Sequence, residues 1–156
     1  MNPWYAAKAL PIRVSPDIRG GFDIGFDDRI PEEMRAELRR FVVWVEKNFP
    51  VPVPLWVDFE YKHYLMSRSK KRMGYLFYHS DFAEWPVFNS LDDMPIIRLP
   101  VRTEHSTLEE ILFSFIEAIT CYFIWLSNGY AQDAHPLPDG DDAEEILQAY
   151  LHHNPT

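Results

Sequence analysis

The sequence predicts an α+β domain in which a small, mainly antiparallel sheet is packed by a long central helix and by N- and C-terminal helices. Segments with apolar residues at helical spacing flank a group of segments rich in Val, Ile and aromatic residues. This order is typical of helices placed on one face of an antiparallel sheet. The chain has 156 residues, 47 % of them hydrophobic, so residues 1–156 are sufficient for a single domain with its own core.

The N-terminal helix is predicted over residues 31–49, PEEMRAELRRFVVWVEKNF. Pro31 suits a first helical position, and the acidic residues 32 and 33 complement the positive end of the helix dipole. One stripe of apolar side chains recurs at helical spacing: Met34, Leu38, Phe41, Val42 and Val45. The preceding residues 1–30 contain several prolines and glycines, and within them segment 12–26 is expected to supply at most one or two short edge strands.

Three strands are predicted between the helical regions. Residues 50–61 are rich in Val, Trp, Phe and Tyr, which favour a half-buried pleated surface, and prolines confine the start of this segment to an edge or a lead-in. YLFYHS (75–80) and MPIIRLPVR (94–102) follow. Two of these segments lie about one hairpin apart, so antiparallel pairing is expected.

The central helix is predicted from about Thr107 to Ser127, with Ser106 and Glu109 fitting a capping box at its start. Apolar residues cover most of its circumference, which predicts burial on most sides. One narrow stripe is polar or reactive and contains Glu110, Ser114, Glu117 and Cys121. This stripe is either a solvated ridge or the lining of a cleft. A last helix, AEEILQAYLHH (143–153), closes the fold.

The central helix is similar to that of small bacterial zincin-like metallopeptidases. Residues 117–125, EAITCYFIW, resemble a family helix written approximately HELTHYFQW, with matches at Thr120, Tyr122, Phe123 and Trp125. MPIIRLPV resembles the family's edge strand, which lies beside the substrate, and AEEILQAYL resembles the C-terminal helix that often brings the third metal ligand. The resemblance covers about residues 74–151 and implies a zincin-like fold.

The residues that peptidase chemistry needs are missing from this helix. Two imidazoles at i and i+4 must reach one zinc, and a carboxylate must take a proton from the metal-bound water. Glu117 and Cys121 stand at the two ligand positions, and Ala118 stands where the base belongs. Alanine cannot accept a proton. We therefore expect no catalytic residue, no resident metal and no cofactor, with Glu117, Ala118 and Cys121 marking a degenerate site.

The resulting functional prediction is a non-catalytic zincin-like domain, a pseudo-peptidase that binds a peptide or protein partner. The predicted cleft lies between the central helix and the strand around Ile96–Val101, with Ile97, Arg98, Leu99 and Ser114 as candidate lining residues. An exposed strand edge there could pair with an extended peptide.

Two other functions stay open from the sequence. A small acidic immunity- or inhibitor-type protein could cover a basic partner by charge complementarity. A residual metal-dependent hydrolase could use Glu117 and Cys121 with a third ligand from the acidic residues of segment 139–145.

Charge and cysteine content narrow the partners and the compartment. The formal net charge of −9 argues against binding to nucleic acids or anionic membranes. The one basic cluster, RSKKR (68–72), is interpreted as a solvated loop. Cys121 is the only cysteine, and the N-terminus lacks the pattern of a signal peptide, so a cytoplasmic location is expected. The longest apolar run, interrupted by polar residues, is taken as too polar for a membrane span.

Overall fold

The computed structural model describes residues 2–9, 19–61, 76–78, 95–101, 107–127 and 139–153. Its sheet has four strands in the order β1-β2-β4-β3: β1 (Phe22–Phe26), β2 (Leu55–Tyr61), β3 (Leu76–Tyr78) and β4 (Ile96–Val101). β1 pairs with β2 in parallel and β2 pairs with β4 in parallel, whereas β3 is antiparallel to β4. The described part of the sheet is therefore mainly parallel.

The prediction of a mainly antiparallel sheet was wrong. α2 (Glu32–Asn48) lies between β1 and β2 in the sequence, and these two strands are sheet neighbours in parallel, so they form a β-α-β unit. A parallel connection needs this long crossover, whereas a hairpin turn cannot provide it. β3 and β4 form the one antiparallel pair among the described strands.

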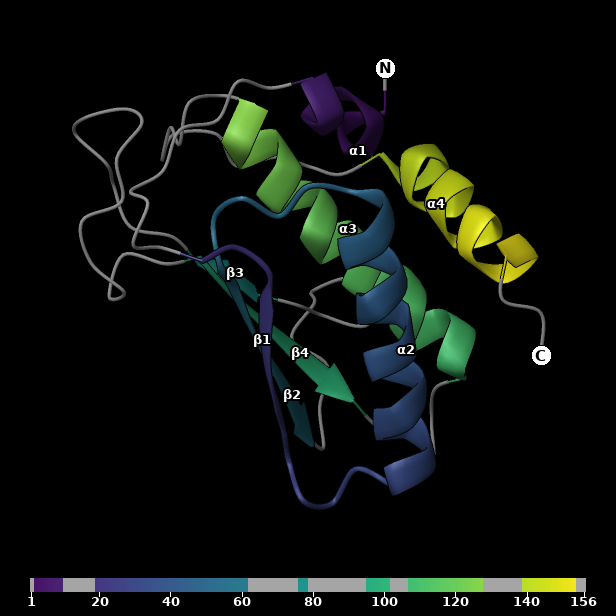
Figure 1. The fold of residues 1–156 in the computed structure, drawn as a ribbon. Coiled ribbons are helices and arrows are strands. Elements are labelled where there is room, and N and C mark those ends of the chain that lie inside the picture. Colours follow the sequence, from purple (N-terminus) through teal and green to yellow (C-terminus); the bar gives the residue numbers. More distant parts are fainter. Residues whose placement is uncertain are drawn as a thin grey trace.

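The side chains of the sheet alternate between a covered and an open face. Leu55, Val57 and Phe59 on β2 are buried, whereas Trp56, which lies between Leu55 and Val57, is 41 % exposed. Phe59 packs edge-on against Phe115 of α3, with ring centroids 5.1 Å apart. α2 and α3 therefore pack on this inward face of the sheet (Figure 1).

α2 forms because its apolar residues recur at helical spacing, and it buries Leu38, Phe41, Val42 and Val45. It begins one residue later than predicted, because Pro31 is the residue before the first helical position. The carbonyl of Pro31 still accepts a hydrogen bond from the amide of Arg35. Acidic residues 32 and 33 occupy the first turn, where the helix dipole favours negative charge.

α3 (Leu108–Ser127) is the long central helix, and it runs without a break through the span predicted for it. Most of its residues from Ile111 onward are buried. Its phenolic Tyr122 exchanges hydrogen bonds with the backbone of Val53 just before β2. α3 is long and apolar enough to cross a membrane by length and composition, contrary to the expectation from the sequence, but 78 % of its most apolar window is buried inside the fold.

The first and last helices of the described chain both pack against α3. Helix α1 (Pro3–Ala6) and the 3-10 turn η1 (Ala7–Ala9) pack against α3, and α4 (Gly140–His153) packs on α3 from another side. The fully buried Trp4 of α1 donates its indole N–H to the Thr120 hydroxyl at 2.9 Å. Residues from all the helices and from β2 and β4 share one hydrophobic core.

Several predicted features lie outside the described residues. They include the RSKKR cluster, the Ser106 position of the predicted capping box, and the loop that precedes α4. Only residues 76–78 of the predicted strand YLFYHS are described, as β3.

Candidate functional site

Glu110 in the first turn of α3 is exposed, but the rest of the reactive stripe is closed to solvent. Ser114, Glu117 and Cys121 are 3 %, 1 % and 4 % exposed, and Ala118 is fully buried. Glu117 and Cys121 are one turn apart on the helix, so they share a face as the sequence indicates. That face belongs to the protein interior. The three polar or reactive side chains therefore do not line an open surface.

Two of the candidate third metal ligands near the start of α4, Asp139 and Glu145, accept local hydrogen bonds. The side-chain amide (Nδ2) of Asn2 donates to the Glu145 carboxylate at 2.8 Å and to the backbone carbonyl of Asp142 at 3.1 Å. The Asp139 carboxylate accepts from the amide of Asp141 at 2.8 Å and so caps the helix. Within the described ranges, no three His, Cys, Asp or Glu side chains gather to hold a metal ion.

The predicted cleft residues on β4 lie within the sheet and not at its edge. β4 pairs with β2 along residues 96–101 and with β3 along residues 96–98. Ile97 and Leu99 are fully buried, and Arg98 points to the other face, where its Nε lies 3.9 Å from a carboxylate oxygen of Glu60. The prediction that Ile96–Val101 is an edge strand was therefore wrong, because β4 has a paired strand on each side.

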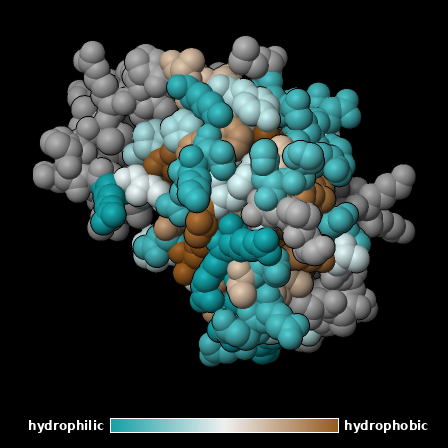
Figure 2. Space-filling view, turned by 45° about the vertical axis from the view of Figure 1, so that its right-hand side comes forward, coloured by the Kyte–Doolittle hydropathy of each residue, from teal (hydrophilic) through white to brown (hydrophobic). Residues whose placement is uncertain are grey.

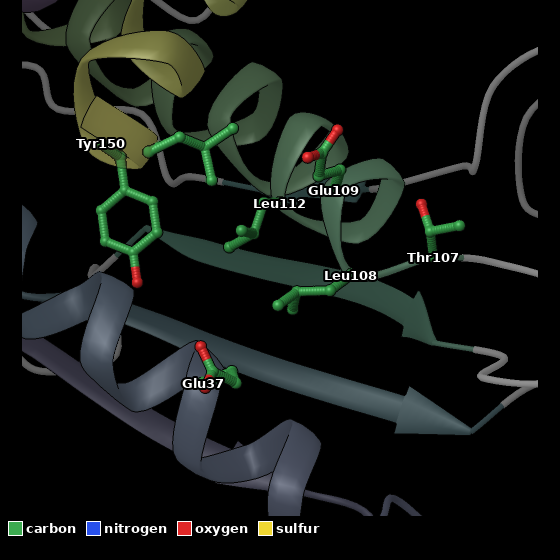
Figure 3. Close-up of a pocket in the computed structure, with 7 residues that line it drawn as sticks. Glu37, Thr107, Leu108, Glu109, Leu112 and Tyr150 are labelled. Carbon is green, nitrogen blue, oxygen red and sulfur yellow. The ribbon is translucent and has the colours of Figure 1, made fainter. Parts of the chain in front are cut away.

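The described surface has a different hollow, a pocket of about 410 Å³ at the meeting point of α2, α3 and α4 (Figure 3). Its walls combine apolar side chains from α3 and α4 with carboxylates from α2 and α3. They are Glu37, Thr107, Leu108, Glu109, Leu112, Tyr150 and Leu151. Ligand pockets commonly measure roughly 300–1,000 Å³, so this one fits a small group or a single inserted side chain. We call it the three-helix pocket.

The apolar floor of the three-helix pocket follows from helix periodicity. Leu108 and Leu112 are four residues apart on α3 and therefore project from the same face. Leu112 is buried in the core, and Leu108 is only half-buried. In the space-filling view, hydrophobic side chains appear in narrow gaps between polar ones, without forming a broad patch (Figure 2).

Tyr150 forms a rigid wall of the three-helix pocket. Its ring lies edge-on to Phe41 at 5.0 Å and to Trp44 at 5.3 Å, so two aromatic side chains of α2 fix its orientation. Its hydroxyl points toward the side of α2 that carries Glu37 (Figure 3). Burial, more than the nearby Glu37 carboxylate, raises the pKa of Tyr150, and Arg40 offsets part of this effect. The phenol therefore stays protonated at neutral pH.

The carboxylates are at the solvent side of the three-helix pocket. Glu37 is 36 % exposed, and one of its oxygens lies 4.0 Å from an Arg40 nitrogen, at the outer limit of an ion pair. Glu109 is exposed in the first turn of α3. No lysine or arginine is among the residues that line the described pocket, so its rim carries negative charge.

The N-terminus of α3 is capped at the rim of the three-helix pocket. The Thr107 hydroxyl accepts from the amide of Glu110 at 3.2 Å, and it lies 3.3 Å from the Glu110 carboxylate. The observed cap is thus Thr107 with Glu110, one residue beyond the predicted pair of Ser106 and Glu109. This cap fixes the start of α3 and therefore the positions of Leu108 and Glu109, its first two residues.

The three-helix pocket lies near the carboxyl end of β4, which ends at Val101 shortly before Thr107 in the sequence. In sheets of parallel strands with helices beside them, ligands bind preferentially outside the carboxyl ends of the strands. This site was not predicted from the sequence, although the i, i+4 pair Leu108 and Leu112 beside the acidic first turn of α3 was a signal for it.

No protein-family model matches the chain, and neither the curated proteins nor the solved structures contain a match to it. The geometry of the described residues therefore carries the functional argument.

Proposed function

We propose that this chain is a non-catalytic domain that binds a peptide or protein partner through the three-helix pocket. The observation that carries the proposal is the pocket itself, about 410 Å³ with an apolar floor and a polar rim. Such a combination suits recognition, because apolar contact supplies affinity and a few polar groups fix orientation.

The absence of catalysis is part of the proposal. Ala118 stands where a zincin-like peptidase would carry its base, and the neighbouring Glu117 and Cys121 are closed to solvent. A substrate carbonyl would have to reach these residues from solvent for hydrolysis to occur. The likeness to zincin-like peptidases thus supports a scaffold without the family's chemistry.

A cytoplasmic location belongs to the same proposal. Cys121 is the only cysteine and is buried, so the chain has no second cysteine for an internal disulfide, which suits a reducing compartment. α3 is mostly buried, as expected for the core helix of a soluble protein.

The test is a selection of binders from a random peptide library displayed on phage, with the full chain as target. Selected peptides are then measured against two variants that each introduce one tryptophan. Leu108→Trp fills the three-helix pocket, and Val43→Trp places a tryptophan on an exposed site of α2, where Val43 is 58 % exposed. We expect Leu108→Trp to weaken binding at least tenfold and Val43→Trp to leave it unchanged.

Selection of peptides that bind both variants as tightly as the parent would refute the pocket as the binding site. Failure to select any peptide would count against the proposal in the same way. A circular dichroism spectrum and thermal melt of each variant show that it is folded before it is compared.

A further inference from the structure

We infer that the three-helix pocket receives a lysine or arginine side chain of a basic partner. This inference rests on the proposed function, because it names the chemical class of the group that the pocket binds. Its evidence is the combination of an apolar floor, a carboxylate rim and an aromatic wall within one pocket.

The apolar floor matches the stem of such a side chain. Lysine and arginine carry three or four methylene groups below the charged head, and these pack along apolar surface while the head stays near water. Leu108, Leu112 and Leu151 line the three-helix pocket and offer this surface. A carboxylate-bearing or short polar side chain would leave the leucines in contact with water.

The rim matches the charged head. Glu37 and Glu109 are the charged residues that line the described pocket, and both are acidic. A cation drawn to the rim would therefore meet charge complementarity, whereas an anion would meet repulsion. The ring of Tyr150 lines the same pocket but is only 3 % exposed, so it adds packing surface at the wall, and the two carboxylates carry the preference for a cation.

Arg40 occupies part of the role that the partner's cation would take. It lies 4.0 Å from Glu37, and 47 % of its side chain is exposed, so the contact is long and solvated. Such pairs are weak, and an incoming cation can displace this one. Arg40 is therefore an internal competitor, and its removal should strengthen binding.

The charge of the whole chain acts in the same direction. A net charge of −9 attracts a basic partner over distance and raises its association rate, most strongly at low salt. The partner class is thus a basic protein or peptide that presents a lysine or arginine beside apolar residues.

The first test uses three small probes of equal chain length: hexylammonium chloride, hexan-1-ol and sodium hexanoate. Each is titrated into the ¹⁵N-labelled full chain, and the amide shifts of Leu108, Leu112 and Leu151 report occupation of the pocket. We expect hexylammonium to bind most tightly, hexanol more weakly, and hexanoate not at all. Raising the salt concentration should weaken the binding of hexylammonium and leave the binding of hexanol unchanged.

The second test changes charge in opposite directions. Glu37→Gln should weaken the binding of hexylammonium about fivefold, whereas Arg40→Gln should strengthen this binding. Glu46→Gln is the matched control, because this exposed residue loses the same charge on the same helix, about 13.5 Å further along its axis. It should bind hexylammonium like the parent.

The results separate this inference from the proposed function. If pocket-directed peptides are selected but hexanol binds as tightly as hexylammonium, the pocket binds a partner without choosing cations, and the inference fails alone. If Glu37→Gln and Arg40→Gln change affinity in the same direction, the carboxylate rim is not the source of the preference, which also overturns it. If no peptide requires the pocket, the proposed function fails first.

Discussion

The hydrogen bond between Trp4 and Thr120 should fix α1 to α3 with a measurable coupling energy. Both side chains are fully buried, and the indole N–H lies 2.9 Å from the Thr120 hydroxyl oxygen. That hydroxyl donates in turn to the carbonyl of Ile116 at 2.7 Å. The indole ring also packs edge-on against Phe49 and Phe123, each at 4.9 Å. The contact therefore joins segments 116 residues apart in the sequence.

The two single substitutions should each lower the free energy of unfolding. Thr120→Val keeps the shape of the side chain and removes the acceptor, which leaves a buried indole N–H without a hydrogen bond at a cost of roughly 1–3 kcal/mol. Trp4→Phe removes the donor and part of the ring, which costs roughly 2–3 kcal/mol from the lost hydrogen bond and the space left behind.

The double variant should lose less than the sum of the single losses. Once the donor is gone, removal of the acceptor no longer strands it, so the coupling energy should be about 1–2 kcal/mol. Guanidinium unfolding followed by circular dichroism measures all four proteins. For a chain of this size, a loss of about 2 kcal/mol corresponds to a fall in Tm of roughly 4–8 °C.

The control is Tyr5→Phe, a neighbouring substitution on a side chain that is 38 % exposed. It should change the free energy of unfolding by less than about 0.5 kcal/mol. If Trp4→Phe and Thr120→Val prove additive within about 0.5 kcal/mol, the two side chains do not share a hydrogen bond, and the placement of α1 against α3 is refuted.

Three further predictions concern catalysis, the helix cap and acid stability. The chain should not cleave casein or fluorogenic peptides with added zinc, and chelator-sensitive turnover that Glu117→Gln abolishes would contradict this. Thr107→Ala should cost about 1 kcal/mol in urea unfolding because the cap of α3 is lost, while Thr107→Ser should cost less, and equal losses would count against the cap. Hydrogen bonds from Arg29 hold the pKa of Asp27 well below its usual range. The stabilisation by Asp27 is therefore fully present above the unfolded-state pKa of about 4 and is lost as the pH falls below it. Asp27→Asn should flatten the pH dependence of Tm in that range. An unchanged profile would contradict the ion pair with Arg29 as its source.

The helices could be predicted from the sequence because their signals are local. The apolar stripe of α2 and the long apolar run of α3 each exceed the length of a strand, so the periodicity identifies them directly. Strand direction was not predictable in the same way, because it depends on which distant segments become neighbours. One clue was available in Ile96–Val101, a nearly continuous apolar run, which is more typical of a buried parallel strand than of an exposed edge.

The candidate site was harder to predict than the fold. Glu37, Leu112 and Tyr150 come from three helices, and their meeting depends on how α2, α3 and α4 pack. Tyr150 looks from the sequence like an ordinary apolar-face residue of the last helix. The family resemblance directed attention to Glu117 and Cys121, whose spacing is visible in the sequence but whose burial is not.

The three-helix pocket and the reactive stripe lie on different sides of α3. An α-helix turns about 100° per residue, so Glu117 lies about 180° from Leu108 and about 140° from Leu112. A single ligand in the pocket therefore cannot contact the positions where a zincin-like peptidase would hold zinc. The pocket proposal does not depend on the family resemblance, because none of the pocket's lining residues belongs to the reactive stripe.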